Sequence, residues 1–134
     1  MRRFPEPDAA ISTILVVADA DASARWYEQV LGAELFRTYG GTTAVLQFQG
    51  TWLVLVTGGG PTPDKPGVTM AEPDDPSRVS HSFTIRVEDC RGTYDALRAR
   101  GAEFLTPPVD RESEIRCFFS DPDGHLFELS QSLS

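Results

Sequence analysis

Charged side chains lie inside two predicted strands, where they could bind a ligand. Arg86 sits in the middle of one alternating apolar run, and Arg116 sits in another. A guanidinium in mid-strand requires water or a carboxylate partner, because burying it without one is costly. Glu114 and Glu128 are the candidate partners. Arginines and carboxylates beside apolar walls predict a site that binds a small organic molecule by stacking and directed hydrogen bonds.

Strand periodicity decides which other side chains share a face with these arginines. Successive side chains of a strand point to opposite sides of the sheet, so every second residue lines the same face. In the segment 114–119 either parity is possible. We assign Glu114, Arg116 and Phe118 to the face that lines the site, because burying this polar set under other structure would be costly. The residues expected to line the site are Ser12, Val16, Trp52, Val54, Ser82, Arg86, Arg116, Phe118 and Glu128, joined by Ile14, Val56 and Thr84, with Leu126 as a further candidate.

The elements that must position these residues occur twice in the chain. Residues 11–37 and 81–106 each contain an alternating strand, an acidic turn, a short helix ending in Gly, and a strand that opens on Ala-Glu. An offset near 70 residues is too long for a solenoid repeat, so it predicts two halves of one domain. We expect a single domain, 1–134, with a first module at 11–57, a connector at 58–79 that holds five of the ten prolines, and a second module at 80–131.

Turn residues and apolar periodicity predict the boundaries of these elements. In the first half we expect a strand at 11–18, a helix capped by Asp21 or Ser23 and closed by Gly32, and strands at 34–38, 43–49 and 51–57. In the second half we expect a strand at 81–87, a helix at 90–100, and strands at 103–106, 113–119 and 125–131.

Composition limits the classes of partner. With 134 residues the chain can bury a core, and its net charge of −8 argues against nucleic acid, which requires a basic face. We find neither an apolar run of membrane-spanning length nor a signal peptide, so no membrane partner is expected. Cys90 and Cys117 are too few for a disulfide framework, which favours a reducing cytoplasm.

The order βαβββ, repeated, resembles the vicinal oxygen chelate superfamily, which includes glyoxalases, bleomycin-resistance proteins and extradiol dioxygenases. The phrases ASARWYEQVLG and FFSDPDGHLFELSQ carry the likeness, which covers residues 11–131. The resemblance implies an α+β fold, with two tandem βαβββ modules that form curled mixed sheets around a cleft. It also implies a homodimer.

The enzymes of this superfamily hold a divalent metal ion in the cleft. The resemblance implies ligands in the first strand of each module, in the fourth strand and in the last strand. Carried over one at a time, these positions are Ser12, Ser82, Val54 and Glu128. Only Glu128 is a strong metal ligand, because transition metals prefer imidazole, thiolate and carboxylate donors.

His81 is the alternative second ligand, one position before Ser82. It shares the parity of Phe83, so it faces away from the cleft unless a one-residue bulge shifts it. His125 lies in the turn DPDGH, where exposed polar residues are expected, and we assign it no role.

Two functions follow. The ligand positions favour a metal-independent protein that binds and sequesters a small, drug- or antibiotic-like molecule, with no cofactor. The alternative is a metal-dependent enzyme of the same superfamily (a lyase, isomerase, transferase or dioxygenase) with one divalent ion on Glu128 and His81. The choice between enzyme and binding protein stays open at this point.

Overall fold

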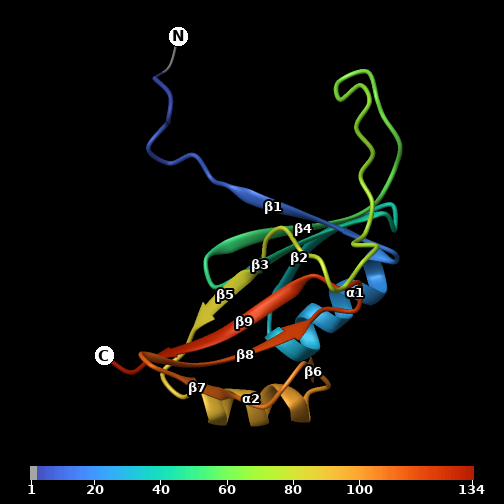
Figure 1. Ribbon diagram of the computed structural model, residues 1–134. Helices are drawn as coiled ribbons and strands as arrows, with labels where there is room; N and C mark the ends of the chain where they lie inside the picture. Colours follow the sequence, from blue (N-terminus) through green and yellow to red (C-terminus); the bar gives the residue numbers. More distant parts are fainter. Residues whose placement is uncertain (1–2) are drawn as a thin grey trace.

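The computed structural model describes residues 3–134 and contains two β-sheets of matching design (Figure 1). The first sheet has the strand order β1-β4-β3-β2, with β1 and β4 parallel and the other pairs antiparallel. Its elements are β1 (Ser12–Val17), helix α1 (Ala20–Trp26), a π-helical turn η1 (Tyr27–Leu31), β2 (Glu34–Tyr39), β3 (Thr43–Phe48) and β4 (Thr51–Thr57).

The second sheet repeats this plan, with the order β5-β9-β8-β6 and with β7 paired to β8. Here β5 and β9 are the parallel pair, which corresponds to β1 and β4 of the first sheet. Its elements are β5 (Phe83–Arg86), α2 (Cys90–Ala99), β6 (Glu103–Phe104), β7 (Val109–Arg111), β8 (Glu114–Ser120) and β9 (Leu126–Ser132). The predicted α+β class, with two mixed sheets, is confirmed.

Several boundaries differ from the sequence-based predictions. Helix α1 begins at Ala20, because the side chain of Asp19, and not that of Asp21 or Ser23, accepts the backbone N–H of Ala22 at 3.0 Å. Strand β5 begins only at Phe83, so residues 81 and 82 precede it. The strand expected at 103–106 ends at Phe104, shortly before two prolines that cannot donate to a ladder, and β7 is an additional short strand.

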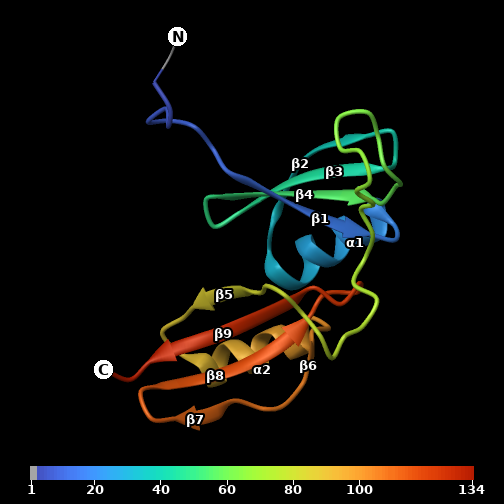
Figure 2. The same cartoon turned by 45° about the horizontal axis from the view of Figure 1, so that its top comes forward.

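A shared aromatic core joins the two modules. Trp26 and Tyr27 extend from the first module onto the inner side of the second sheet, and α1 lies between the two sheets in Figure 2. The ring centroids of Trp26 and Phe119 are 6.4 Å apart, and those of Tyr27 and Phe127 are 6.1 Å apart. Phe119 and Phe127 are stacked at 5.2 Å. The hydrophobic core therefore covers the side of each sheet that packs against the helices. The opposite side, which we call the open face, remains accessible to ligands or partners.

The turn 121–125 binds the first module through buried hydrogen bonds. Tyr27 Oη donates to Asp121 Oδ2 at 2.6 Å, and both side chains are buried. Asp121 Oδ1 accepts the backbone N–H groups of Asp123 and His125 at 2.9 and 2.8 Å. Burial and the neighbouring Asp121 carboxylate raise the pKa of the Tyr27 hydroxyl far above its ordinary value, so Tyr27 remains a donor.

The same turn also contacts the end of β1. Asp123 Oδ1 accepts the backbone N–H of Ala18 at 2.9 Å, and His125 Nε2 lies 2.8 Å from the carbonyl oxygen of Val16. His125 is only 9 % exposed, so the expectation of an exposed turn residue without a role was wrong. The reason is tertiary, because the first module covers a turn that local sequence places on the surface.

The two cysteines lie in contact between α2 and the second sheet. Their sulfur atoms are 3.8 Å apart, and both residues are buried. Burial raises the pKa of both thiols, and that of Cys117 reaches about 12. At neutral pH both are therefore protonated thiols that act as core side chains.

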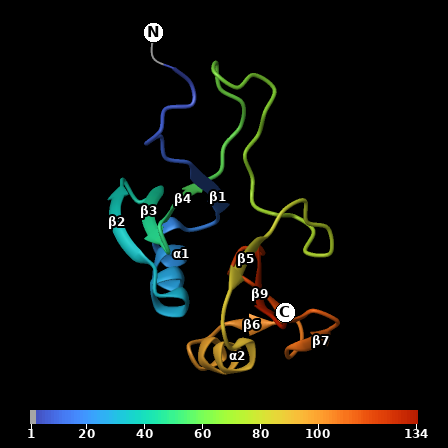
Figure 3. The ribbon, with the colours of Figure 1, turned by 90° about the vertical axis from the view of Figure 1, so that its left-hand side faces the viewer.

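The connector leaves β4 as a long excursion away from both sheets (Figure 3). Gly59 and Met70 exchange backbone hydrogen bonds at 2.9 Å, which closes the base of the excursion. Lys65 Nζ donates to the carbonyl oxygens of Gly60 and Val68 at 2.7 and 3.1 Å.

Among the described residues, 3–134, no helix is long and apolar enough to cross a membrane.

The substitution Tyr27→Phe tests the bond between the modules. It removes the hydroxyl from Asp121 and leaves a buried carboxylate with one donor fewer, so unfolding free energy should fall by about 1–3 kcal/mol. Urea denaturation measures the change. Tyr94→Phe is the control, since Tyr94 is half-buried against Phe104, and it should cost much less. Equal losses in the two variants would contradict a special role for the Tyr27 hydroxyl.

Candidate functional site

The open face of the second sheet carries the carboxylate of Glu128. In the strand register Thr84, Glu128 and Phe118 are direct neighbours across β5, β9 and β8. Thr84 Oγ1 donates to Glu128 Oε1 at 2.8 Å, which orients the carboxylate. Glu128 is half-buried and can therefore meet a ligand that lies on this face.

Two arginines occupy the next row of the same face. Arg86 and Arg116 flank Ser130 in the register. The Arg116 guanidinium lies 5.8 Å from the centroid of the Phe118 ring. The carboxylate of Glu114 accepts from Ser130 Oγ at 3.1 Å. Glu114 and Glu128 thus bond to hydroxyls, and not to Arg86 as we expected.

These arginines are available to a ligand. In the part of the chain that the structure describes, no carboxylate lies within 4 Å of the guanidinium of Arg86 or Arg116. Arg86 is exposed, and Arg116 is half-buried on Phe118. A solvated guanidinium binds planar anions such as carboxylates or phosphonates through paired hydrogen bonds. The open face therefore combines two arginines, an aromatic ring and a carboxylate.

Several of the other predicted site residues lie on the open face of the first sheet. Ser12 pairs with Trp52 in the register, and Ile14 pairs with Val54. The Trp52 ring meets the edge of Phe36, with centroids 5.3 Å apart. This face is apolar and solvent-exposed, with Ile14 at 53 % and Phe36 at 60 % exposure. Ser82 is exposed and precedes β5, while Val16 is buried near the connector.

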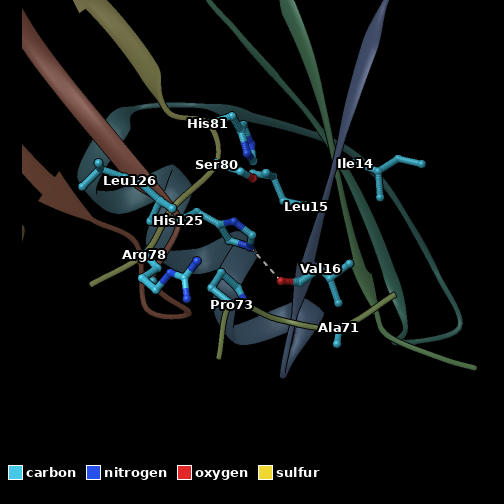
Figure 4. Close-up of a pocket in the computed structure, with 12 residues that line it drawn as sticks. Ile14, Leu15, Val16, Ala71, Pro73, Arg78, Ser80, His81, His125 and Leu126 are labelled. Atoms are coloured by element: carbon cyan, nitrogen blue, oxygen red, sulfur yellow. Dashed lines mark hydrogen bonds between the residues drawn. The ribbon is translucent and has the colours of Figure 1, made fainter. Parts of the chain in front are cut away.

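A separate cavity lies at the seam between the two modules. We call it the seam cavity; it has a volume of about 280 Å³ and is bounded by residues 14–16 of β1, connector residues between 71 and 81, and residues 124–126 at the start of β9 (Figure 4). His81 and His125 both line it. The His81 ring also contacts Phe83, with centroids 5.9 Å apart. Sequence reasoning missed this cavity because the connector forms one of its walls.

The described residues offer few donor groups for a divalent metal ion. Glu128 fits as one ligand, because its carboxylate is oriented and lies on an open face. Ser12, Ser82 and Val54 are weak donors or none. Among residues 3–134, no three His, Cys, Asp or Glu side chains gather around one point. The donors that one chain supplies therefore do not complete a metal site by themselves.

The chain is similar over most of its length to several named proteins. A probable lactoylglutathione lyase of Vibrio parahaemolyticus is 31 % identical over 91 % of this chain and 89 % of its own length. The metallothiol transferase FosB of Lysinibacillus sphaericus is 30 % identical over 84 % of this chain and 74 % of its own length. The crystal structure of a glyoxalase/bleomycin resistance protein/dioxygenase from Nocardioides superposes with a TM-score of 0.70 at 26 % identity, over 96 % of this chain and 86 % of that one.

These relatives overturn the prediction that the protein has no cofactor. FosB is named a metallothiol transferase. The crystal structure of FosX from Listeria monocytogenes holds Mn(II) and sulfate. It shares this fold with a TM-score of 0.69 at 17 % identity, over 95 % of this chain and 92 % of that one. The prediction of metal independence was wrong, because it rested on the weak donors at three positions and these relatives are metal-dependent. The alternative of one divalent metal ion fits the relatives.

The match to the family extends across both modules. The family model of the Glyoxalase/Bleomycin resistance protein/Dioxygenase superfamily matches residues 10–129, from just before β1 to the middle of β9. The paired sheets, with β1 parallel to β4 and β5 parallel to β9, are the fold of the solved relatives. The chain belongs to the Glyoxalase/Bleomycin resistance protein/Dioxygenase superfamily.

Proposed function

We propose that this protein is a metal-dependent enzyme of its superfamily that acts on a small organic molecule at the open face of the second sheet. The observation that carries the proposal is Glu128, a carboxylate at a ligand position of the family, oriented by Thr84 and placed beside two available arginines. The named relatives favour a lyase or a transferase over the other classes of the superfamily.

Different residues of the open face would bind different parts of the substrate. Arg86 and Arg116 would bind an anionic group of the substrate, because neither guanidinium has a carboxylate within 4 Å among the described residues. Phe118 would pack against its body. The carboxylate of Glu128, which Thr84 orients through a hydrogen bond to Oε1, would be a ligand of the divalent ion. Further ligands would come from the substrate or from a second copy of the chain.

The substitution Glu128→Gln tests the metal proposal. Untagged protein should take up Mn²⁺, Ni²⁺ or Zn²⁺, and a concentration 100-fold above Kd should stabilise it by about 2.7 kcal/mol. Calorimetric melting and metal analysis measure both effects, and Glu128→Gln should remove most of them because an amide is a weaker ligand than a carboxylate.

Glu103→Gln is the matched control, since Glu103 is exposed on β6, and it should behave like the unaltered protein. Assays for lactoylglutathione lyase activity and for thiol transfer to fosfomycin, with and without metal, decide between the two enzyme classes. Metal uptake that is unaffected by Glu128→Gln would contradict the assignment of the ligand.

We further propose that two copies associate through the first sheet. Its open face presents Ile14, Phe36 and Tyr39 at 50–60 % exposure, and Ile11 beside it is 86 % exposed. An exposed apolar patch of this kind marks an interaction surface. A symmetric dimer would cover it and bring the first sheet of one copy close to a ligand site.

Light scattering tests the association. At micromolar concentration the particle should have twice the 14.7 kDa of one chain. The substitution Ile14→Glu places a charge on the open face and should yield monomers, whereas Val79→Glu on the exposed connector should not. A monomeric unaltered protein would refute the proposal.

Tryptophan fluorescence tests whether a ligand reaches the first sheet. Trp52 lies on the open face, whereas Trp26 packs in the aromatic core against Tyr27. Binding of the dye anilinonaphthalene sulfonate should quench Trp52 by energy transfer, so Trp52→Phe should remove most of the quenching. Trp26→Phe should preserve it. The reverse pattern would place the apolar binding surface elsewhere.

A further inference from the structure

We propose that the seam cavity binds a small organic carboxylate, at a place separate from the open face around Glu128. The cavity lies between the edge of β1, the connector and the start of β9 (Figure 4). Its volume of about 280 Å³ is near the lower end of the range for small-molecule pockets, which is about 300–1,000 Å³. The proposal does not depend on the metal site.

The wall of the cavity carries one formally charged side chain, Arg78, and its charge is opposite in sign to that of the protein. The chain has a net charge of −8 and two histidines, and both histidines line this cavity together with Arg78. Among the described residues that form its wall, none is acidic. A guanidinium in a wall that has no carboxylate can form charge-assisted hydrogen bonds with an anion that enters the cavity.

Aspartates also lie near this cavity, and three of them accept hydrogen bonds from groups other than Arg78. Asp121 accepts from Tyr27 and from two backbone N–H groups, and Asp123 accepts from Ala18. Asp75 accepts from the backbone N–H and the hydroxyl of Ser77 at 3.0 and 2.6 Å. Within residues 3–134, no carboxylate lies within 4 Å of the Arg78 guanidinium.

The donors are held around one space. His125 Nε2 faces the carbonyl oxygen of Val16, which can only accept, so this nitrogen carries the hydrogen and the ring is fixed as a wall. Figure 4 shows Arg78 and His81 on the connector side of the same space. The Arg78 guanidinium can bind both oxygens of a carboxylate, and His81 and Ser80 add further donors.

The rest of the wall selects an organic anion over an inorganic one. Ile14, Val16, Pro73 and Leu126 supply apolar surface to the same cavity. Desolvating a bare phosphate against this surface would be costly, whereas an apolar body would gain by contacting it. A short carboxylic acid with a flat or branched apolar body therefore matches both the donor groups and the apolar side chains of the cavity.

Histidine ring NMR tests the proposal with no interfering signal, because the only two histidines of the chain line the cavity. In untagged full-length protein, titration with benzoate should shift both ring signals and reach saturation. Benzyl alcohol and benzylamine have the same body without the negative charge, and they should bind about tenfold more weakly or worse. Inorganic phosphate should also bind more weakly than benzoate.

Variants identify the groups responsible. Arg78→Gln should weaken benzoate binding by about tenfold, because it removes a charge-assisted hydrogen bond. Arg98→Gln is the control, since Arg98 lies on α2 with its guanidinium 5.3 Å from the Tyr94 ring centroid, and it should leave binding unchanged. Glu128→Gln should also leave benzoate binding unchanged, which separates this site from the proposed enzyme site.

Three results would overturn the proposal: equal shifts with benzylamine, tighter binding of phosphate than of benzoate, or benzoate binding that is insensitive to Arg78→Gln. Arg78 lies on the exposed connector, so its variant is expected to fold. An amide NMR spectrum of Arg78→Gln that matches the unaltered protein outside the connector establishes this directly.

Discussion

The buried hydrogen bond between Tyr27 and Asp121 is the interaction on which the arrangement of the two modules depends. It joins the helical segment of the first module to the turn before β9, at a distance of 2.6 Å. The same turn binds Ala18 and Val16 through Asp123 and His125. Because buried polar groups are costly unless they are paired, this network allows one relative position of the modules and disfavours others.

The position of the core decides where ligands can bind. The aromatic side chains of Trp26, Tyr27, Phe119 and Phe127 fill the space between the helical sides of the sheets. Ligands can reach the open side of each sheet and the seam where the connector passes. The open sides differ in chemistry, since the first is apolar and the second carries two arginines and Glu128.

The chain belongs to the superfamily, yet its described residues do not form a complete metal site. At the four positions where the resemblance implies ligands, the chain has Glu128, Ser12, Ser82 and Val54, and only Glu128 is a strong donor. Named relatives are nevertheless metal-dependent by name or hold Mn(II) in the crystal. Weak donors at three positions led to the wrong expectation, because the donors of one chain need not be the whole ligand set of a metal ion.

Much of the fold followed from the sequence, because it rests on local patterns. The repeat, the alternation that places Arg86 and Arg116 on one face, and the turn residues at each strand end are all readable from neighbouring residues. Tertiary structure alone decided that His125 is buried, that Glu114 and Glu128 bond to hydroxyls and not to Arg86, and that the connector closes a cavity. These features join residues that are 16 to 109 positions apart, and no local preference of the chain specifies such contacts.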